Sequence, residues 1–175
     1  MGIEYARRLR RRQGRLGDTW HLEELFVTIQ GQRQYLWRTV DQDGDVIDIL
    51  VQPRRDQRAV DRFCRKLLKG PGREPRRLVT DKLRTYEAAR RTLMPSVVHD
   101  TERYTNNRPE VSPESIRQRE RQMRGFQSVG QAQRFWSVHR VNQNLFRVRR
   151  HLLRSANHRM LRARSLLVWN EVTSA

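Results

Sequence analysis

The chain has 175 residues, the length of one domain or of one domain with a short appendage. It carries 37 Lys and Arg against 19 Asp and Glu, a net charge of +18, and its single cysteine excludes an internal disulfide and a multi-cysteine zinc site. No run of about 18 apolar residues exists, and the N-terminal residues lack an apolar segment. We therefore expect neither a membrane-spanning helix nor a secretory signal, and we predict a cytoplasmic protein.

The first half of the chain predicts an antiparallel meander of three strands. Apolar side chains alternate with polar ones over residues 20–29, which is the period of a strand with one buried face. Residues 35–40 and 46–51 predict two more strands, and Asp43-Gly44 between them is a hairpin signal.

The second half alternates between helices and short strands. Asp56 is the expected N-cap of a helix that ends at Gly70, and residues 78–80 form a short buried strand. We expect a second helix over residues 84–93 and a weak fifth strand over residues 96–98. The rest of the chain is mostly helical in pattern.

This order of elements predicts an α/β fold. Three antiparallel strands, then alternating helices and strands, then C-terminal helices fit a mixed sheet that is covered by helices. The ribonuclease H-like fold has this order, and some unrelated α/β folds share it, so the order by itself leaves both open.

Two arginine-rich segments flank the centre of the chain. Residues 7–15 hold six arginines, and residues 115–165 hold thirteen arginines and one acid. Such basic arms favour a polyanionic partner, most simply nucleic acid. An anionic membrane surface is the competing interpretation, but no stretch combines basic residues with a broad apolar face. We expect a nucleic acid as the partner, with no membrane and no small-molecule substrate.

Three acids stand where they could hold divalent cations. Glu23 lies on the first strand, Asp81 follows the fourth, and Glu110 stands where a helix begins. Phosphodiester chemistry commonly uses two divalent ions about 3.5–4 Å apart, and carboxylates from separate elements supply the oxygen ligands. Each acid alone also has a structural explanation: strand-edge polarity for Glu23, a helix N-cap for Asp81, and a first helical turn for Glu110.

Several short motifs stand in a fixed order along the chain. They are Trp20-His21-Leu22-Glu23-Glu24, Tyr35-Leu36-Trp37-Arg38, Thr80-Asp81-Lys82, Asn106-Asn107-Arg108 before Glu110, and Asn144-Leu145-Phe146-Arg147. Together they resemble the transposases with an Asp-Asp-Glu (DDE) catalytic core in the insertion sequence six family of bacteria. The resemblance covers nearly the whole chain.

The resemblance implies a ribonuclease H-like fold with a retroviral-integrase type of catalytic core. It implies cleavage of DNA at the ends of a mobile element, followed by attack of a 3′-hydroxyl on target DNA. It also implies that Glu23, Asp81 and Glu110 are the catalytic acids and bind two Mg²⁺ ions, for which Mn²⁺ is a possible substitute. A homo-oligomer that acts at the bacterial nucleoid is the expected form.

Three departures from the family pattern lead us to expect reduced or lost activity. The family places aspartate where this chain has Glu23, whose side chain is one methylene longer. Pro109 and Pro113 flank Glu110 and would disturb the helix that carries it. We interpret residues 1–18 as a basic lead-in that remains from a missing N-terminal DNA-binding region.

The remaining expectations concern domains and DNA contacts. We expect residues 19–126 to form the catalytic core and residues 127–175 to form the basic helical C-terminal part of the same domain. The side chains expected to contact DNA are Lys82, Arg117, Arg121, Arg124, Arg147, Arg149 and Arg150. A solvated face is the alternative for the helical arginines. The alternative function is an inactive remnant that only binds DNA or an intact transposase, and a small RNA-binding protein is a third hypothesis.

Overall fold

The computed structural model describes residues 2–11, 16–70, 73–80, 84–101, 118, 125–147 and 155–174. The chain divides into two compact units. The larger unit is formed by residues 16–133, and the smaller one by residues 1–15 together with residues 134–175.

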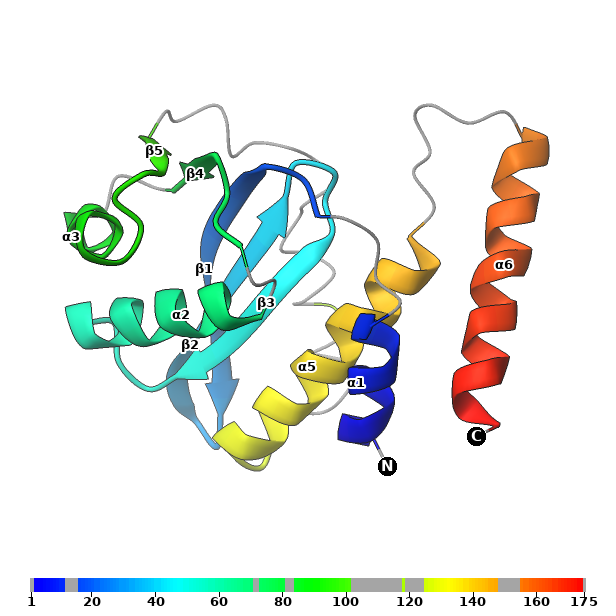
Figure 1. Cartoon of the computed structure of the whole chain (residues 1–175). Helices are drawn as coiled ribbons and strands as arrows, with labels where there is room; N and C mark the ends of the chain where they lie inside the picture. The colour runs from blue at the N-terminus through cyan, green and yellow to red at the C-terminus, as the bar shows by residue number, and fades with distance from the viewer. Residues whose placement is uncertain are drawn as a thin grey trace. The chain divides into compact units, whose positions relative to one another are not determined.

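The larger unit is built on a five-stranded mixed sheet with the strand order β3-β2-β1-β4-β5 (Figure 1). Its first three strands, β1 (Thr19–Ile29), β2 (Gln32–Asp41) and β3 (Val46–Gln52), pair antiparallel. The short strands β4 (Arg77–Val79) and β5 (Val98–Asp100) run parallel to β1. The predicted meander and the predicted mixed α/β sheet are confirmed.

Turn chemistry fixes the register of the meander. Gly31 and Gly44 have φ values of 75° and 88°, which glycine adopts without steric cost, and they lie in the β1–β2 and β2–β3 turns. The carboxylate of Asp41 accepts hydrogen bonds from the backbone N–H groups of Asp43 and Asp45, at 3.0 and 2.9 Å. The acidic stretch therefore closes a hairpin.

Two helices share a core with one face of the sheet. The first is α2 (Gln57–Lys69), and the carboxylate of its predicted N-cap, Asp56, accepts a hydrogen bond from the N–H of Ala59 at 2.8 Å. The second is α3 (Arg84–Leu93). The buried residues of this core from the sheet include Trp20, Leu22 and Trp37. Each such side chain contributes about 1.5–3 kcal/mol on burial, so the core makes the sheet a rigid base.

The fifth strand lies two residues later in the chain than predicted. The structure places Pro95 and Ser96 in a turn, in which the N–H of Val97 donates to the carbonyl of Met94 at 3.1 Å. Val97 is buried in the core, and pairing with β4 begins only at the next residue. The predicted strand therefore included Val97, an apolar residue that packs in the core and does not pair with β4.

The smaller unit is helical and contains α1 (Gly2–Arg11), α6 (Ser155–Thr173) and most of α5 (Val129–Phe146). The α1 helix lies within the basic lead-in. Its Ala6 and Leu9 are buried with Val141 and Val172. Apolar residues three apart in an arginine-rich segment are thus enough to form a buried helical stripe. No described helix is long and apolar enough to cross a membrane.

Candidate active site

Glu23 lies on β1, on the sheet face opposite to the core that contains Leu22. Its cross-strand partner in β2 is Arg38. Arg38 donates from Nε and Nη2 to the Oε2 atom of Glu23, at 3.1 and 2.5 Å. Only 3% of the Arg38 side chain and 15% of the Glu23 side chain are exposed. The candidate first acid is therefore one half of a mostly buried ion pair.

Burial and the guanidinium act on Glu23 in opposite directions. Burial raises the pKa of the Glu23 carboxyl above its ordinary value, and the charge and hydrogen bonds of Arg38 offset only part of that rise. Both Arg38 hydrogen bonds go to Oε2, so Oε1 is the oxygen to which Arg38 does not donate. One carboxylate oxygen of Glu23 is thus the candidate ligand for a divalent cation, which binds oxygen donors of this kind.

The neighbouring acid, Glu24, faces the core side of the sheet. Its carboxylate is 2.8 and 2.9 Å from Nε of Arg55, and the hydroxyl of Tyr86 in α3 donates to it at 3.5 Å. Strand alternation therefore separates the two acids, and Glu24 cannot replace Glu23 on the opposite face.

The parallel pairing of β1 with β4 brings the strand before Asp81 next to the strand that carries Glu23. His21 of β1 pairs with Val79 of β4. Thr80 comes next, is buried, and donates its backbone N–H to the carbonyl of Asp100 at 3.0 Å. Asp81 is the following residue in the sequence.

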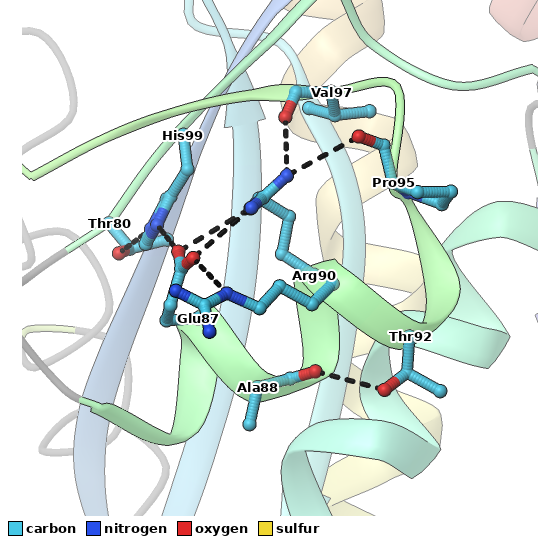
Figure 2. A network of polar contacts seen from close by, with 9 residues as sticks. Thr80, Glu87, Ala88, Arg90, Thr92, Pro95, Val97 and His99 are labelled. Carbon is cyan, nitrogen blue, oxygen red and sulfur yellow. Dashed lines mark hydrogen bonds and ion pairs between the residues drawn. The ribbon is translucent and has the colours of Figure 1, made fainter.

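A polar network joins the end of β4 to α3 (Figure 2). The Nε2 atom of His99 lies 2.7 Å from Oγ1 of Thr80, and its Nδ1 atom lies 2.5 Å from Oε2 of Glu87. Arg90 and Arg91 also donate to Glu87, at 3.1 and 2.8 Å. The hydrogen bonds of Arg90, then those of His99 and Arg91, lower the pKa of Glu87 to about 2. Glu87 is therefore a permanent anion near neutral pH.

Most of the predicted site residues lie outside the described part of the chain. These are Asp81, Lys82, Glu110, Arg117, Arg121, Arg124, Arg149 and Arg150, and the flanking Pro109 and Pro113 also lie outside it. Arg147 is described, directly after α5 in the smaller unit, and is half-buried. Within the described ranges, no group of three or more His, Cys, Asp or Glu side chains is arranged to hold a metal ion.

Sequence reasoning missed the partners of the site residues. Arg38 stands between Trp37 and Thr39 in a strand of mostly buried residues, and a buried arginine requires an acid on a neighbouring strand. That signal was present, but Glu23 becomes its partner only once the register is known. His99 carried no such signal, because its contacts come from residues 12 and 19 positions away.

Comparison with known protein families shows the family of this chain. The model of a family described as the DDE domain matches residues 17–149, which is more than half of the chain. The chain belongs to the DDE-domain family of insertion-sequence transposases. The matched range includes all three predicted acids, together with Arg38 and His99.

Two curated transposases of Staphylococcus aureus are each 27% identical to this DDE-domain chain over 118 residues. One is the transposase for insertion sequence-like element IS431mec of strain Mu50 / ATCC 700699, and the other is the transposase for insertion sequence element IS257 in transposon Tn4003. Each alignment covers 65% of this chain and 51% of the relative. The chain therefore spans about half the length of the curated relatives it matches.

A solved structure has the same fold. It is a chain in the cryo-EM structure of the simian T-cell lymphotropic virus intasome in complex with PP2A regulatory subunit B56 gamma. The TM-score is 0.52 at 12% identity, over 86% of this chain and 57% of that chain. This likeness, with the observed sheet, confirms the predicted ribonuclease H-like fold of the integrase type.

Proposed function

We propose that this chain is the catalytic core of an insertion-sequence transposase, which cleaves DNA at the ends of a mobile element and joins it to target DNA. The observation that carries the proposal is Glu23, which Arg38 holds on a strand directly beside the one that leads to Asp81. Membership of the DDE-domain family supports strand transfer, and the net charge of +18 supports a DNA partner.

We infer that Glu23, Asp81 and Glu110 hold two Mg²⁺ ions, or Mn²⁺ ions in their place. Glu23 fits such a site because both Arg38 hydrogen bonds go to its Oε2 and not to its Oε1. His21 pairs with Val79, and Glu23 and Asp81 each follow two residues later in the sequence. When bound, the ions would stabilise the charge on the attacking and leaving oxygens of the phosphodiester.

In this proposal, the chain positions the carboxylates that bind the ions. Glu23 has one more rotatable bond than the aspartate of the family pattern, so an unsupported side chain would sample more positions. The two hydrogen bonds from the buried Arg38 restrict it. Such preorganisation before the substrate arrives is what a site of this kind requires.

The basic side chains are the proposed contacts to DNA. These are Lys82, Arg117, Arg121, Arg124, Arg147, Arg149 and Arg150. The excess of thirteen arginines over one acid in residues 115–165 supports phosphate binding. Element ends and target DNA would both be bound in this way, by a homo-oligomer located in the cytoplasm at the nucleoid.

The test is metal-dependent nicking of supercoiled plasmid DNA that carries the ends of IS257, the element of one relative. We expect the full chain to nick the plasmid with Mn²⁺ or Mg²⁺ and not with EDTA. Glu23→Gln, Asp81→Asn and Glu110→Gln should each remove the nicking while DNA binding, measured by fluorescence anisotropy, persists. Nicking that continues in all three variants would overturn the proposal.

A second candidate function is DNA binding without catalysis, and the glutamate at position 23 favours it. Mg²⁺ requires near-ideal octahedral geometry, and the longer side chain changes where the ligand oxygen lies. This function predicts binding that weakens steeply with salt, no metal-dependent nicking, and no gain of nicking in Glu23→Asp.

A further inference from the structure

One histidine contacts the chain on both sides of Asp81. Thr80 directly precedes this acid, and α3 begins at Arg84, three residues after it. Figure 2 shows the His99 ring between Thr80 and Glu87, which α3 carries. The ring nitrogens reach Oγ1 of Thr80 at 2.7 Å and Oε2 of Glu87 at 2.5 Å. The segment that contains Asp81 thus has both of its flanks tied to the same side chain.

The ionised Glu87 determines which ring nitrogen of His99 carries the proton. With its pKa lowered to about 2, Glu87 is an acceptor near neutral pH, so Nδ1 of His99 carries the proton and donates. This leaves Nε2 for the hydroxyl of Thr80, which can donate or accept as the ring requires. Arg90 fixes Glu87 in turn and also donates to the carbonyl of Val97, at 3.1 Å.

The backbone of Thr80 is held as firmly as its side chain. Its N–H donates to the carbonyl of Asp100 at 3.0 Å, and Val79 pairs with Asp100 in the parallel β4–β5 ladder. His99 itself pairs with Leu78 in the same ladder. Thr80, the residue that precedes Asp81 in the sequence, is therefore fixed to β5 by both its backbone N–H and its side chain.

A row of threonine, histidine and glutamate also resembles an activated nucleophile, but burial excludes that role. Thr80 is only 1% exposed, and 7% of the His99 side chain is exposed. A substrate could not reach the hydroxyl without opening the β4–β5 pair. The row therefore acts on its neighbours in the fold and not on a bound substrate.

We propose that His99 is a positioning residue for Asp81. By holding Thr80 and Glu87 together, it sets the spacing between the end of β4 and the first turns of α3. This inference rests on the proposed function, because the place of Asp81 matters to the rate only if the acid acts in the metal-dependent site. A displacement of about 1 Å in such a site can cost on the order of 100-fold in rate.

The test compares Thr80→Val with Thr80→Ser in the full chain. Valine keeps the approximate shape of threonine and removes the hydroxyl, whereas serine keeps the hydroxyl. Loss of a contact that orients a metal ligand typically costs about 10–100-fold in metal affinity or activity. Thr80→Val should therefore lower the plasmid-nicking rate, or raise the Mn²⁺ concentration for half-maximal rate, by about this factor. Thr80→Ser should remain close to the wild-type chain, and anisotropy should give equal DNA affinity for all three.

A second variant separates positioning from stability. The side-chain amide of His99→Asn can still donate to Glu87 as Nδ1 does, but it does not reach Thr80. It should therefore match Thr80→Val, and the double variant should lose no more than either single one, because both remove the same contact. Rates are compared at a temperature at which circular dichroism shows every variant folded.

The outcomes separate the inference from the proposed function. Wild-type rates and Mn²⁺ requirements in both Thr80→Val and His99→Asn would overturn the inference alone. A wild-type chain that neither nicks the plasmid nor binds Mn²⁺ would overturn the proposed function, and the inference with it.

Discussion

Two parts of the larger unit lead to candidate acids, and the described contacts in them differ. In the β1–β2 pair, Arg38 contacts the carboxylate of Glu23 itself. At the end of β4, the described contacts join Thr80, which precedes Asp81 in the sequence, to His99, and His99 to Glu87. Glu23 is thus held by a direct contact, whereas the contacts at the end of β4 are made to Thr80, the residue that precedes Asp81 in the sequence. The direct contact couples Glu23 to the stability of the fold, because both members of its pair with Arg38 are mostly buried.

The largest expected effect follows from breaking the direct contact. Arg38→Met leaves Glu23 without its partner in a mostly buried place, and removing one member of a buried pair typically costs about 3–5 kcal/mol of stability. Urea unfolding measures this loss. Arg7→Met is the control, because both members of the Arg7–Glu4 pair are exposed, by 65% and 48%, and it should cost less.

A double variant tests whether the stability loss in Arg38→Met comes from the unpaired carboxylate of Glu23. Replacing both members of a buried pair by apolar residues is often neutral or stabilising. Arg38→Met with Glu23→Leu should therefore be more stable than Arg38→Met alone. Equal stability of the single and double variants would contradict an ion pair at this place.

The next effect concerns the length of the first acid. Glu23→Asp restores the side chain of the family pattern and moves the carboxylate by about one bond. If the ligand distance limits the rate, nicking with Mg²⁺ should rise by on the order of 100-fold, the scale of a 1 Å displacement. The rate is measured on supercoiled plasmid at saturating metal. A lower rate in Glu23→Asp would mean that the Arg38 contact needs the longer side chain.

A smaller effect is expected at the N-terminus of α2. Asp56→Ala removes the N-cap of α2, and loss of such a cap costs about 1 kcal/mol. Thermal unfolding should register this loss, while the nicking rate and the Mn²⁺ requirement stay unchanged. A changed Mn²⁺ requirement would mean that a loss of fold stability by itself disturbs the metal site. The effects of the Thr80 and His99 variants would then not be specific to positioning.

The smallest effect is a pH dependence at the indirect contact. The pKa of Glu87 is about 2 in the folded chain and near 4.5 in its ordinary state. Fewer protons are thus bound when the chain is folded, so this stabilisation is present above pH 4.5 and is lost as the pH falls toward 2. Glu87→Gln should flatten the stability profile over that range in urea titrations. An unchanged profile would show that Arg90, Arg91 and His99 do not hold an ionised Glu87.

The sequence was sufficient where signals are local. Alternation, the turn at Asp43-Gly44 and the cap at Asp56 predicted the meander and α2 with nearly the observed bounds. The fifth strand was misplaced because a core valine and a strand valine give the same apolar signal. For the site, the resemblance supplied Glu23, Asp81 and Glu110, but the contacts made by Arg38 and His99 depend on strand register and on segments distant in sequence.

Glu23 is the proposed metal ligand, and Arg38 holds its other oxygen. Mn²⁺ binding to the full chain, followed by electron paramagnetic resonance, tests this most directly, because free Mn²⁺ gives a signal that decreases on binding. We predict that wild-type chain binds Mn²⁺ and that Glu23→Gln loses most of that binding, with the fold unchanged by circular dichroism. Equal Mn²⁺ binding by the wild-type chain and by Glu23→Gln would contradict the claim.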